Sequence, residues 1–215
     1  MFQFPPLPPI LPIHRSVIFA FAGVFLAVEL LFQLSDIGFL AQNLRWDAYR
    51  NFAFVESWWT RWWEGGRAPL QVWWSPLTYA FLHGGMTHLL LNSAAFLGLG
   101  LVVLRIFGVP LFVVFFLVTA VGGAVTYGLL ATSDGPMVGA SGVVFGLIGV
   151  LKYAEFAFIT RQRQGSMRAF LASIAGLVAI NVILGVAMAG MLAWQTHLGG
   201  FVAGWLAAWA VVPRV

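Results

Sequence analysis

Long apolar runs separated by short polar segments make up most of this chain. An α-helix needs roughly 20 mostly apolar residues to cross the hydrocarbon core of a bilayer. Six runs approach or could reach this length, and they lie at about residues 17–34, 86–107, 110–130, 141–151 and beyond, 168–191 and 196–212. The pattern therefore predicts an all-α membrane protein in which six helices cross the bilayer as one bundle.

A longer segment, residues 35–78, separates the first and second predicted spans. Tryptophan favours the headgroup layer because its ring is apolar while its N–H needs a polar partner. The segment is therefore predicted to be a membrane-associated loop, although a tryptophan belt without a special role is the alternative. It holds seven of the ten tryptophans, namely Trp46, Trp58, Trp59, Trp62, Trp63, Trp73 and Trp74.

The composition agrees with a single membrane domain. Of the 215 residues, 61% are hydrophobic and 8% are charged, and the mean hydropathy is +0.92, which is too apolar for a soluble domain of this length. We expect an N-terminal cytoplasmic tail at residues 1–16, one six-span domain at 17–212 and a C-terminal tail at 213–215. The net charge of +4 comes mainly from short segments between the apolar runs, which favours membrane orientation over nucleic-acid binding.

The basic residues also predict the direction of insertion. Positively charged segments tend to stay in the cytoplasm, so the side with more of them is expected to be cytoplasmic. We therefore expect an integral protein of a bacterial inner (plasma) membrane, with both termini in the cytoplasm and a site that opens to the outer side. With six spans, one side carries Arg15, Arg105, Lys152, Arg161, Arg163, Arg168 and Arg214, and the other carries Arg45, Arg50, Arg61 and Arg67.

Polar side chains gather at the starts of the second, fourth and sixth predicted spans. These starts hold His88 with Asn92, then Ser141, and then His197. Polar groups inside spans are costly and mark helix contacts or function. Taken singly, the serine is more often a packing residue, each histidine a hydrogen-bonded core residue and the asparagine an interhelical contact. Alternate spans begin on the same side, however, so the four residues can converge at one depth.

Glycines indicate how two of these helix starts come together. Gly142 and Gly146 form one pair of small residues four apart, and Gly200 and Gly204 form another. Such pairs let membrane helices approach closely. If the two faces meet, the serine and the histidine beside them come within hydrogen-bond reach of each other.

A serine and a histidine at that distance can act as nucleophile and base. No acidic residue in the sixth span can orient the imidazole, so we expect a dyad rather than a triad. His88 and Asn92 are candidate donors to the oxyanion of a tetrahedral intermediate, together with the backbone N–H of Ser141. His83, Gly139 and Phe145 are expected to line the active site, where His83 and Gly139 help to form a polar cavity that admits water. The chain has no cysteine, which excludes a cysteine nucleophile and thiolate metal sites.

In this order the motifs resemble the rhomboid family of intramembrane proteases. The resemblance covers about residues 73–205, and it is carried by residues 83–92, by residues 139–142 and by residues 197–200 with Gly204. It implies a six-span helical fold and a transmembrane protein substrate that is cut in the bilayer without metal or cofactor.

The resemblance also implies roles for individual residues. Ser141 corresponds to the nucleophile, His197 to the general base, and His88 with Asn92 to the oxyanion donors. Phe145 stands where the family often has a tyrosine that stacks on the histidine. Phenylalanine keeps the ring and loses only the hydroxyl, so the stacking contact is expected here too.

Other classes of function fit the chain less well. The spacing of His83 and His88 does not match the zinc-binding His-Glu-x-x-His helix, and the aspartates all fall in predicted loops, away from any buried pair. A transporter is disfavoured because the two halves show no clear repeat. A catalytically inactive membrane chaperone or binding protein on the same scaffold stays open as the alternative.

Glu29 is a charged residue inside the first predicted span. An ionisable side chain at such a position is expected to face protein or water rather than lipid. We expect it to hold the long loop by hydrogen bonds.

Overall fold

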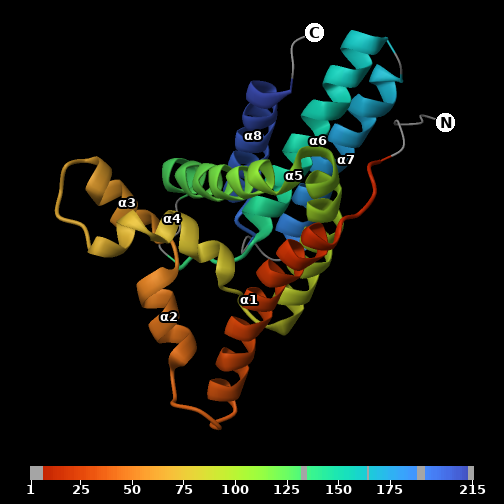
Figure 1. The fold of residues 1–215 in the computed structure, drawn as a ribbon. Coiled ribbons are helices and arrows are strands. Elements are labelled where there is room, and N and C mark those ends of the chain that lie inside the picture. The colour runs from red at the N-terminus through yellow and green to blue at the C-terminus, as the bar shows by residue number, and fades with distance from the viewer. Residues whose placement is uncertain (1–6, 132–134, 164, 188–191, 213–215) are drawn as a thin grey trace.

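The protein folds into a bundle of long helices with smaller helices projecting from its side (Figure 1). This computed structural model describes residues 7–131, 135–163, 165–187 and 192–212. Within them the only strand-like pairing is one isolated antiparallel bridge, so the predicted all-α class is confirmed. The elements are α1 (Pro12–Asp36), α2 (Leu44–Phe52), α3 (Glu56–Trp63), η1 (Leu70–Trp73), α4 (Ser75–Thr78), η2 (Tyr79–Phe81), α5 (Met86–Leu130), α6 (Ser141–Gln162), α7 (Met167–Ala187) and α8 (Trp194–Val211).

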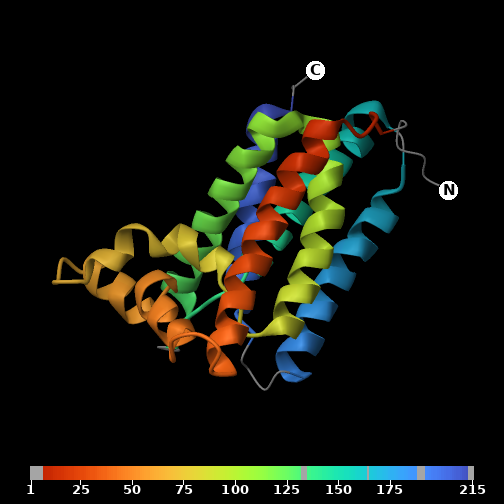
Figure 2. The same cartoon turned by 60° about the horizontal axis from the view of Figure 1, so that its bottom comes forward.

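Helix α5 consists of two segments joined by a sharp bend at Gly108. Its 45 residues divide into 22 before this glycine and 22 after it. Gly108 has a φ of 76°, which glycine adopts without the steric cost of a Cβ atom, and Pro110 removes an N–H that a continuous helix would use. Figure 2 shows the second segment running back in the opposite direction. The bend falls between the two apolar runs of the sequence, 86–107 and 110–130.

Among the described residues, four helices are long and apolar enough to cross a membrane, namely α1, α5, α6 and α7. Each 22-residue segment of α5 is about 33 Å long at 1.5 Å per residue, close to the roughly 30 Å of a hydrocarbon core. Helix α8 has 18 residues, and its first turn carries the polar residues Gln195, Thr196 and His197. Helix α1 begins at Pro12, five residues before the predicted run, since proline suits the first turn of a helix.

The predicted loop at residues 35–78 contains α2, α3, η1 and α4, and α2 and α3 project away from the bundle in both views (Figures 1 and 2). Trp46, Trp63 and Trp73 are each more than half exposed, at 58%, 68% and 68%. Trp59 instead packs against Gly128 near the end of α5. Trp59 is therefore one of the contacts between the loop and the bundle, whereas Trp46, Trp63 and Trp73 are exposed on the outside of the loop.

Helices α6 and α8 touch backbone to backbone. A Cβ atom added to Gly200 would overlap the carbonyl oxygen of Gly142, and one added to Gly204 would overlap that of Gly146. The two glycine pairs singled out in the sequence therefore face each other. Small residues allow this approach, and the van der Waals contact that results is what holds helices together in lipid.

A buried ionic network ties the projecting loop to α1. The carboxylate of Glu29, which is fully buried, accepts hydrogen bonds from the Arg45 guanidinium of α2 at 3.0 and 3.1 Å and from Gln33 at 2.8 Å. Arg45 also pairs with Asp36 at 2.8 Å and donates to the carbonyl of His83 at 3.0 Å. Burial alone would lower the pKa of Arg45, but the bonds to Glu29 and Asp36 raise it above its ordinary value. The predicted contact of Glu29 with the long loop is confirmed.

Replacing Glu29 tests this network. We expect Glu29→Ala to lower the free energy of unfolding by about 3 kcal/mol, because it removes the fully buried partner of Arg45. Asp36→Asn is the matched control, since Asp36 is 45% exposed and its loss should cost less than about 1 kcal/mol. Both values can be measured by SDS titration of the purified protein in mild detergent. Equal stability of Glu29→Ala and the wild type would rule out a structural role for the network.

The glycine contact makes a second prediction. Gly200→Ala places a methyl group on the carbonyl of Gly142, and the backbone atom cannot move aside as a side chain would. We expect a loss of about 2–3 kcal/mol in the same unfolding assay, typical of overpacking. Gly98→Ala, which meets nothing within 4 Å, is the control and should leave stability unchanged or raise it by up to about 1 kcal/mol. The close contact would be disproved by indistinguishable unfolding of the two variants.

Candidate active site

Ser141 is the first residue of α6, and a buried irregular segment leads into it. The N–H of Gly139 donates to the carbonyl of Tyr79 at 3.0 Å. Phe54 and Met137 exchange two backbone hydrogen bonds, of 3.1 and 2.8 Å, and both are buried. Irregular backbone at membrane depth is tolerated only where protein or water satisfies its polar groups. These contacts therefore allow α6 to begin inside the protein.

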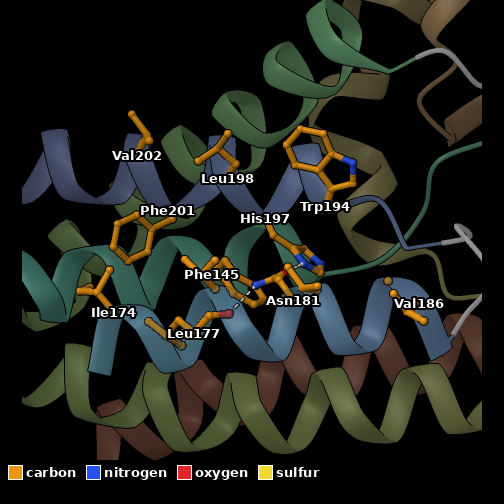
Figure 3. Close-up of a pocket in the computed structure, with 13 residues that line it drawn as sticks. Phe145, Ile174, Leu177, Asn181, Val186, Trp194, His197, Leu198, Phe201 and Val202 are labelled. Atoms are coloured by element: carbon orange, nitrogen blue, oxygen red, sulfur yellow. Dashed lines mark hydrogen bonds between the residues drawn. The ribbon is translucent and has the colours of Figure 1, made fainter. Parts of the chain in front are cut away.

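His197 lies in the first turn of α8 and is held from two sides. Its side chain is buried, with only 4% of the residue exposed. The ring stacks on Phe145 of α6, with ring centroids 4.2 Å apart and planes 9° apart. Its Nδ1 lies 2.7 Å from Oδ1 of Asn181 on α7. The imidazole is therefore fixed by a helix on each side (Figure 3).

Ser141 and His197 lie at the same end of the contact between α6 and α8. Ser141 directly precedes Gly142, and His197 lies three residues before Gly200, which meets that glycine. Within the described residues the serine hydroxyl is not hydrogen bonded to the imidazole, whose Nδ1 is engaged by Asn181 instead. Catalytic hydrogen bonds are often long in the absence of substrate, and Nε2 stays available to the hydroxyl.

His88 and Asn92 come from the first turns of α5. The His88 ring lies against the segment before Ser141, because a Cβ atom on Gly139 would come within 2.7 Å of its Cε1. His88 Nδ1 accepts a hydrogen bond from the N–H of Gly84 at 3.2 Å, which leaves the proton on Nε2. The Asn92 amide donates to the carbonyl of His88 at 2.9 Å and has a second hydrogen to offer. The His88 side chain is thus a donor near the start of α6, and Asn92 offers a second donor one turn further along α5.

His83 lies behind His88. Its ring is fully buried and meets the rings of His88 and Phe25, with centroids 5.3 and 5.5 Å apart. Burial, with a smaller contribution from His88, lowers the pKa of His83 to about 3, so its imidazole is neutral. Its carbonyl accepts a hydrogen bond from Tyr49 at 2.7 Å. In the part of the chain that is described, no third His, Asp or Glu joins this histidine pair to make a metal site.

An apolar cavity of about 660 Å³ opens beside His197, between α7 and α8. Asn181 and His197 bring its polar groups, and Phe145 and Trp194 lie with them (Figure 3). The other lining residues are Ile174, Leu177, Val178, Val182, Gly185, Val186, Leu198, Phe201 and Val202. The expected lining residue Phe145 belongs to this cavity, whereas His83 and Gly139 lie elsewhere, around His88.

Sequence reasoning missed Asn181. It is the only side-chain amide in the apolar run 168–191, so a polar group in lipid was a signal. Nothing in the run, however, indicated the side of α7 that faces α8. Tyr79 was also missed: it is fully buried, and its hydroxyl donates to the carbonyl of Ala120 at 3.0 Å.

The fold and the site define an all-α membrane protein in which a serine and a histidine begin two helices in backbone contact. The sequence profile described as Rhomboid domain matches residues 70–214. The chain therefore belongs to the rhomboid family and is an integral membrane protein.

Curated relatives agree with this family. Rhomboid protease GluP of Bacillus subtilis (strain 168) is 31% identical over 139 residues, which are 65% of this chain and 26% of GluP. RHOMBOID-like protein 4 of Arabidopsis thaliana is 33% identical over 141 residues, 66% of this chain and 34% of that protein. RHOMBOID-like protein 2 of the same plant is 28% identical over 141 residues, 66% and 43% of the two chains. The chain thus spans less than half the length of these relatives.

Proposed function

We propose that this chain is an intramembrane serine protease that hydrolyses peptide bonds in or near transmembrane segments of membrane proteins. Ser141 is the nucleophile and His197 the general base. The observation that carries this proposal is the stacked, buried imidazole of His197 at the same end of the α6–α8 contact as Ser141. Membership of the rhomboid family, and the name of GluP as a protease, support the same activity.

The reaction follows from these two side chains. A serine hydroxyl is a weak nucleophile until a base takes its proton. His197 Nε2 accepts that proton as Ser141 Oγ bonds to the substrate carbonyl carbon, and the carbonyl oxygen becomes an oxyanion. The imidazolium then donates the proton to the leaving amine, and the peptide bond breaks to give an acyl-enzyme. Water, deprotonated by the same imidazole, hydrolyses the ester and restores the serine.

The oxyanion needs donors that are already in place. His88 Nε2–H and the free hydrogen of the Asn92 amide are the proposed side-chain donors. The N–H of Ser141 is a third, because the first N–H groups of a helix have no partner within it. Donors fixed in a site of low polarity stabilise the developing charge more than they stabilise the neutral carbonyl. They therefore act on the transition state.

We further propose that six helices cross the bilayer, the two segments of α5 counting separately and α8 completing the set. The start of α1 and the end of α8 lie at the same end of the bundle, as an even number of crossings requires (Figure 2). The basic residues favour the cytoplasm for that end, which leaves the site open to the outer side. Residues 17–212 form one domain in this scheme, and residues 35–78 lie in the headgroup layer.

The partners of this scheme are lipids and transmembrane protein substrates, with no role for nucleic acid, metal or cofactor. A bacterial plasma membrane stays a prediction, since the similar relatives come from both a bacterium and a plant.

Replacing the nucleophile tests the activity directly. We expect Ser141→Ala to lower cleavage of a single-span reporter protein in lipid vesicles by about 10⁴-fold or more, because His197 then has no hydroxyl to activate. A fluorophosphonate should label the wild type and Ser16→Ala, whose serine is exposed on α1, but not Ser141→Ala. Equal cleavage by the wild type and Ser141→Ala would exclude Ser141 as the nucleophile. Absence of cleavage and of label in the wild type would instead favour a catalytically inactive chaperone or binding protein.

The oxyanion donors give a kinetic prediction. We expect Asn92→Ala and His88→Ala each to lower kcat by about 10²–10³-fold with little change in KM, since these donors act mainly in the transition state. Leu91→Ala, at a 69% exposed position beside Asn92, is the control and should keep wild-type kcat. A rise in KM at constant kcat would show that the two residues bind substrate and do not stabilise the oxyanion.

A further inference from the structure

We propose that Asn181 of α7 is a positioning residue that sets which nitrogen of His197 carries the proton. The proposal rests on the serine protease function above, but it concerns a third helix that the dyad does not require. It begins from the 2.7 Å contact between Asn181 Oδ1 and His197 Nδ1 (Figure 3).

The orientation of the Asn181 amide is fixed by its other contact. Its Nδ2 donates to the carbonyl of Leu177, one turn earlier in α7, at 3.1 Å. A backbone carbonyl can only accept, so the NH₂ group must face Leu177 and the oxygen must face the imidazole. If the amide were flipped, Oδ1 of Asn181 would face the carbonyl oxygen of Leu177, and neither oxygen has a hydrogen to donate.

The orientation of the amide then determines the tautomer of His197. Asn181 Oδ1 carries no hydrogen and can only accept, so Nδ1 of the imidazole must be the donor. In the neutral ring a protonated Nδ1 leaves Nε2 with its lone pair. That nitrogen is the one required to take the proton of Ser141. With the opposite tautomer, Nε2 would carry a hydrogen and could not act as base.

Asn181 also fixes the rotation of the His197 ring, which the stacking contact with Phe145 does not. Stacking on Phe145 fixes the plane of the imidazole but not its rotation within that plane. A hydrogen bond at one edge of the ring fixes that rotation. An amide does so without placing a carboxylate in an apolar cavity, where an unneutralised charge is costly. Asn181 therefore orients the imidazole of His197. The sixth span has no acidic residue that could do so.

A spectroscopic experiment reads the tautomer without relying on activity. The full-length protein, labelled with ¹⁵N-histidine in detergent at neutral pH, should show a protonated Nδ1 and an unprotonated Nε2 for His197, assigned by their loss in His197→Ala. We expect Asn181→Leu to give a mixture of both tautomers, and Asn181→Asp, which keeps an acceptor oxygen, to retain the protonated Nδ1. A spectrum of Asn181→Leu identical to the wild type would overturn the proposal.

The second test of the proposal measures kcat and KM for cleavage of the single-span reporter. We expect Asn181→Leu to lower kcat by about 10- to 100-fold with KM unchanged, because a His197 ring that carries its proton on Nε2 cannot deprotonate Ser141. Asn181→Asp should recover part of kcat. The control is Ile180→Ala, beside Asn181, 53% exposed and away from the cavity, which should keep wild-type kcat.

The two proposals fail in different ways. Full cleavage by Ser141→Ala, or no cleavage by the wild type, would contradict the serine protease mechanism proposed for Ser141 and would leave the tautomer measurement unaffected. Wild-type kcat in Asn181→Leu, or an equal loss in Ile180→Ala, would remove the role of Asn181 and leave the protease function intact. If Asn181→Leu does not fold, Asn181→Ala decides the point, because it also removes the acceptor oxygen, and a spectrum identical to the wild type in that variant would overturn the proposal.

Discussion

The close approach of α6 and α8 is the contact on which the rest of the structure depends. Gly142 and Gly200 leave no room for a side chain between the two backbones. In lipid, apolar helices gain little from hydrophobic burial against each other, so such packing has to supply the attraction. A second side of α8 is held in the same way, because a Cβ atom on Gly199 would overlap the carbonyl of Gly122 in α5. With α8 fixed from both sides, the residues that begin α6 and α8 have a defined separation.

A helix that begins inside the protein leaves backbone polar groups away from water, and the long loop satisfies them. Phe54 pairs with Met137, and the carbonyl of Tyr79 accepts from the N–H of Gly139. Arg45 holds the loop on the buried Glu29 of α1. Because unpaired polar groups in an apolar environment cost several kcal/mol each, the loop is part of the scaffold of the site.

The sequence predicted most of the helices and the cluster of polar residues, for a physical reason. Apolar run length reports directly on helices, and alternate helix starts face the same side, so Ser141, His197 and His88 could be grouped without coordinates of any kind. The partners of Glu29 and Asn181 could not be derived. Four arginines of the long loop could have reached Glu29, and the loop fold that selects Arg45 depends on contacts far apart in the sequence. For Asn181 the missing information was the rotation of α7 about its axis, which a uniformly apolar run does not encode.

The position of Asn181 has a consequence for how the site is built. Among the described residues of α7 only Phe170 is buried, so this helix is held to the bundle less firmly than α6 or α8. The proposed dyad, Ser141 and His197, lies on the two helices that pack closely through glycine contacts, whereas Asn181, proposed to orient the base, comes from the loosely packed α7. In this proposal rigid packing sets the distance between Ser141 and His197, and a single hydrogen bond across the cavity sets the tautomer of His197. A shift of α7 by about 1 Å directly away from His197 would leave the contact between α6 and α8 unchanged. It would break the hydrogen bond of Asn181, because the distance of 2.7 Å would lengthen to about 3.7 Å, beyond hydrogen-bond range.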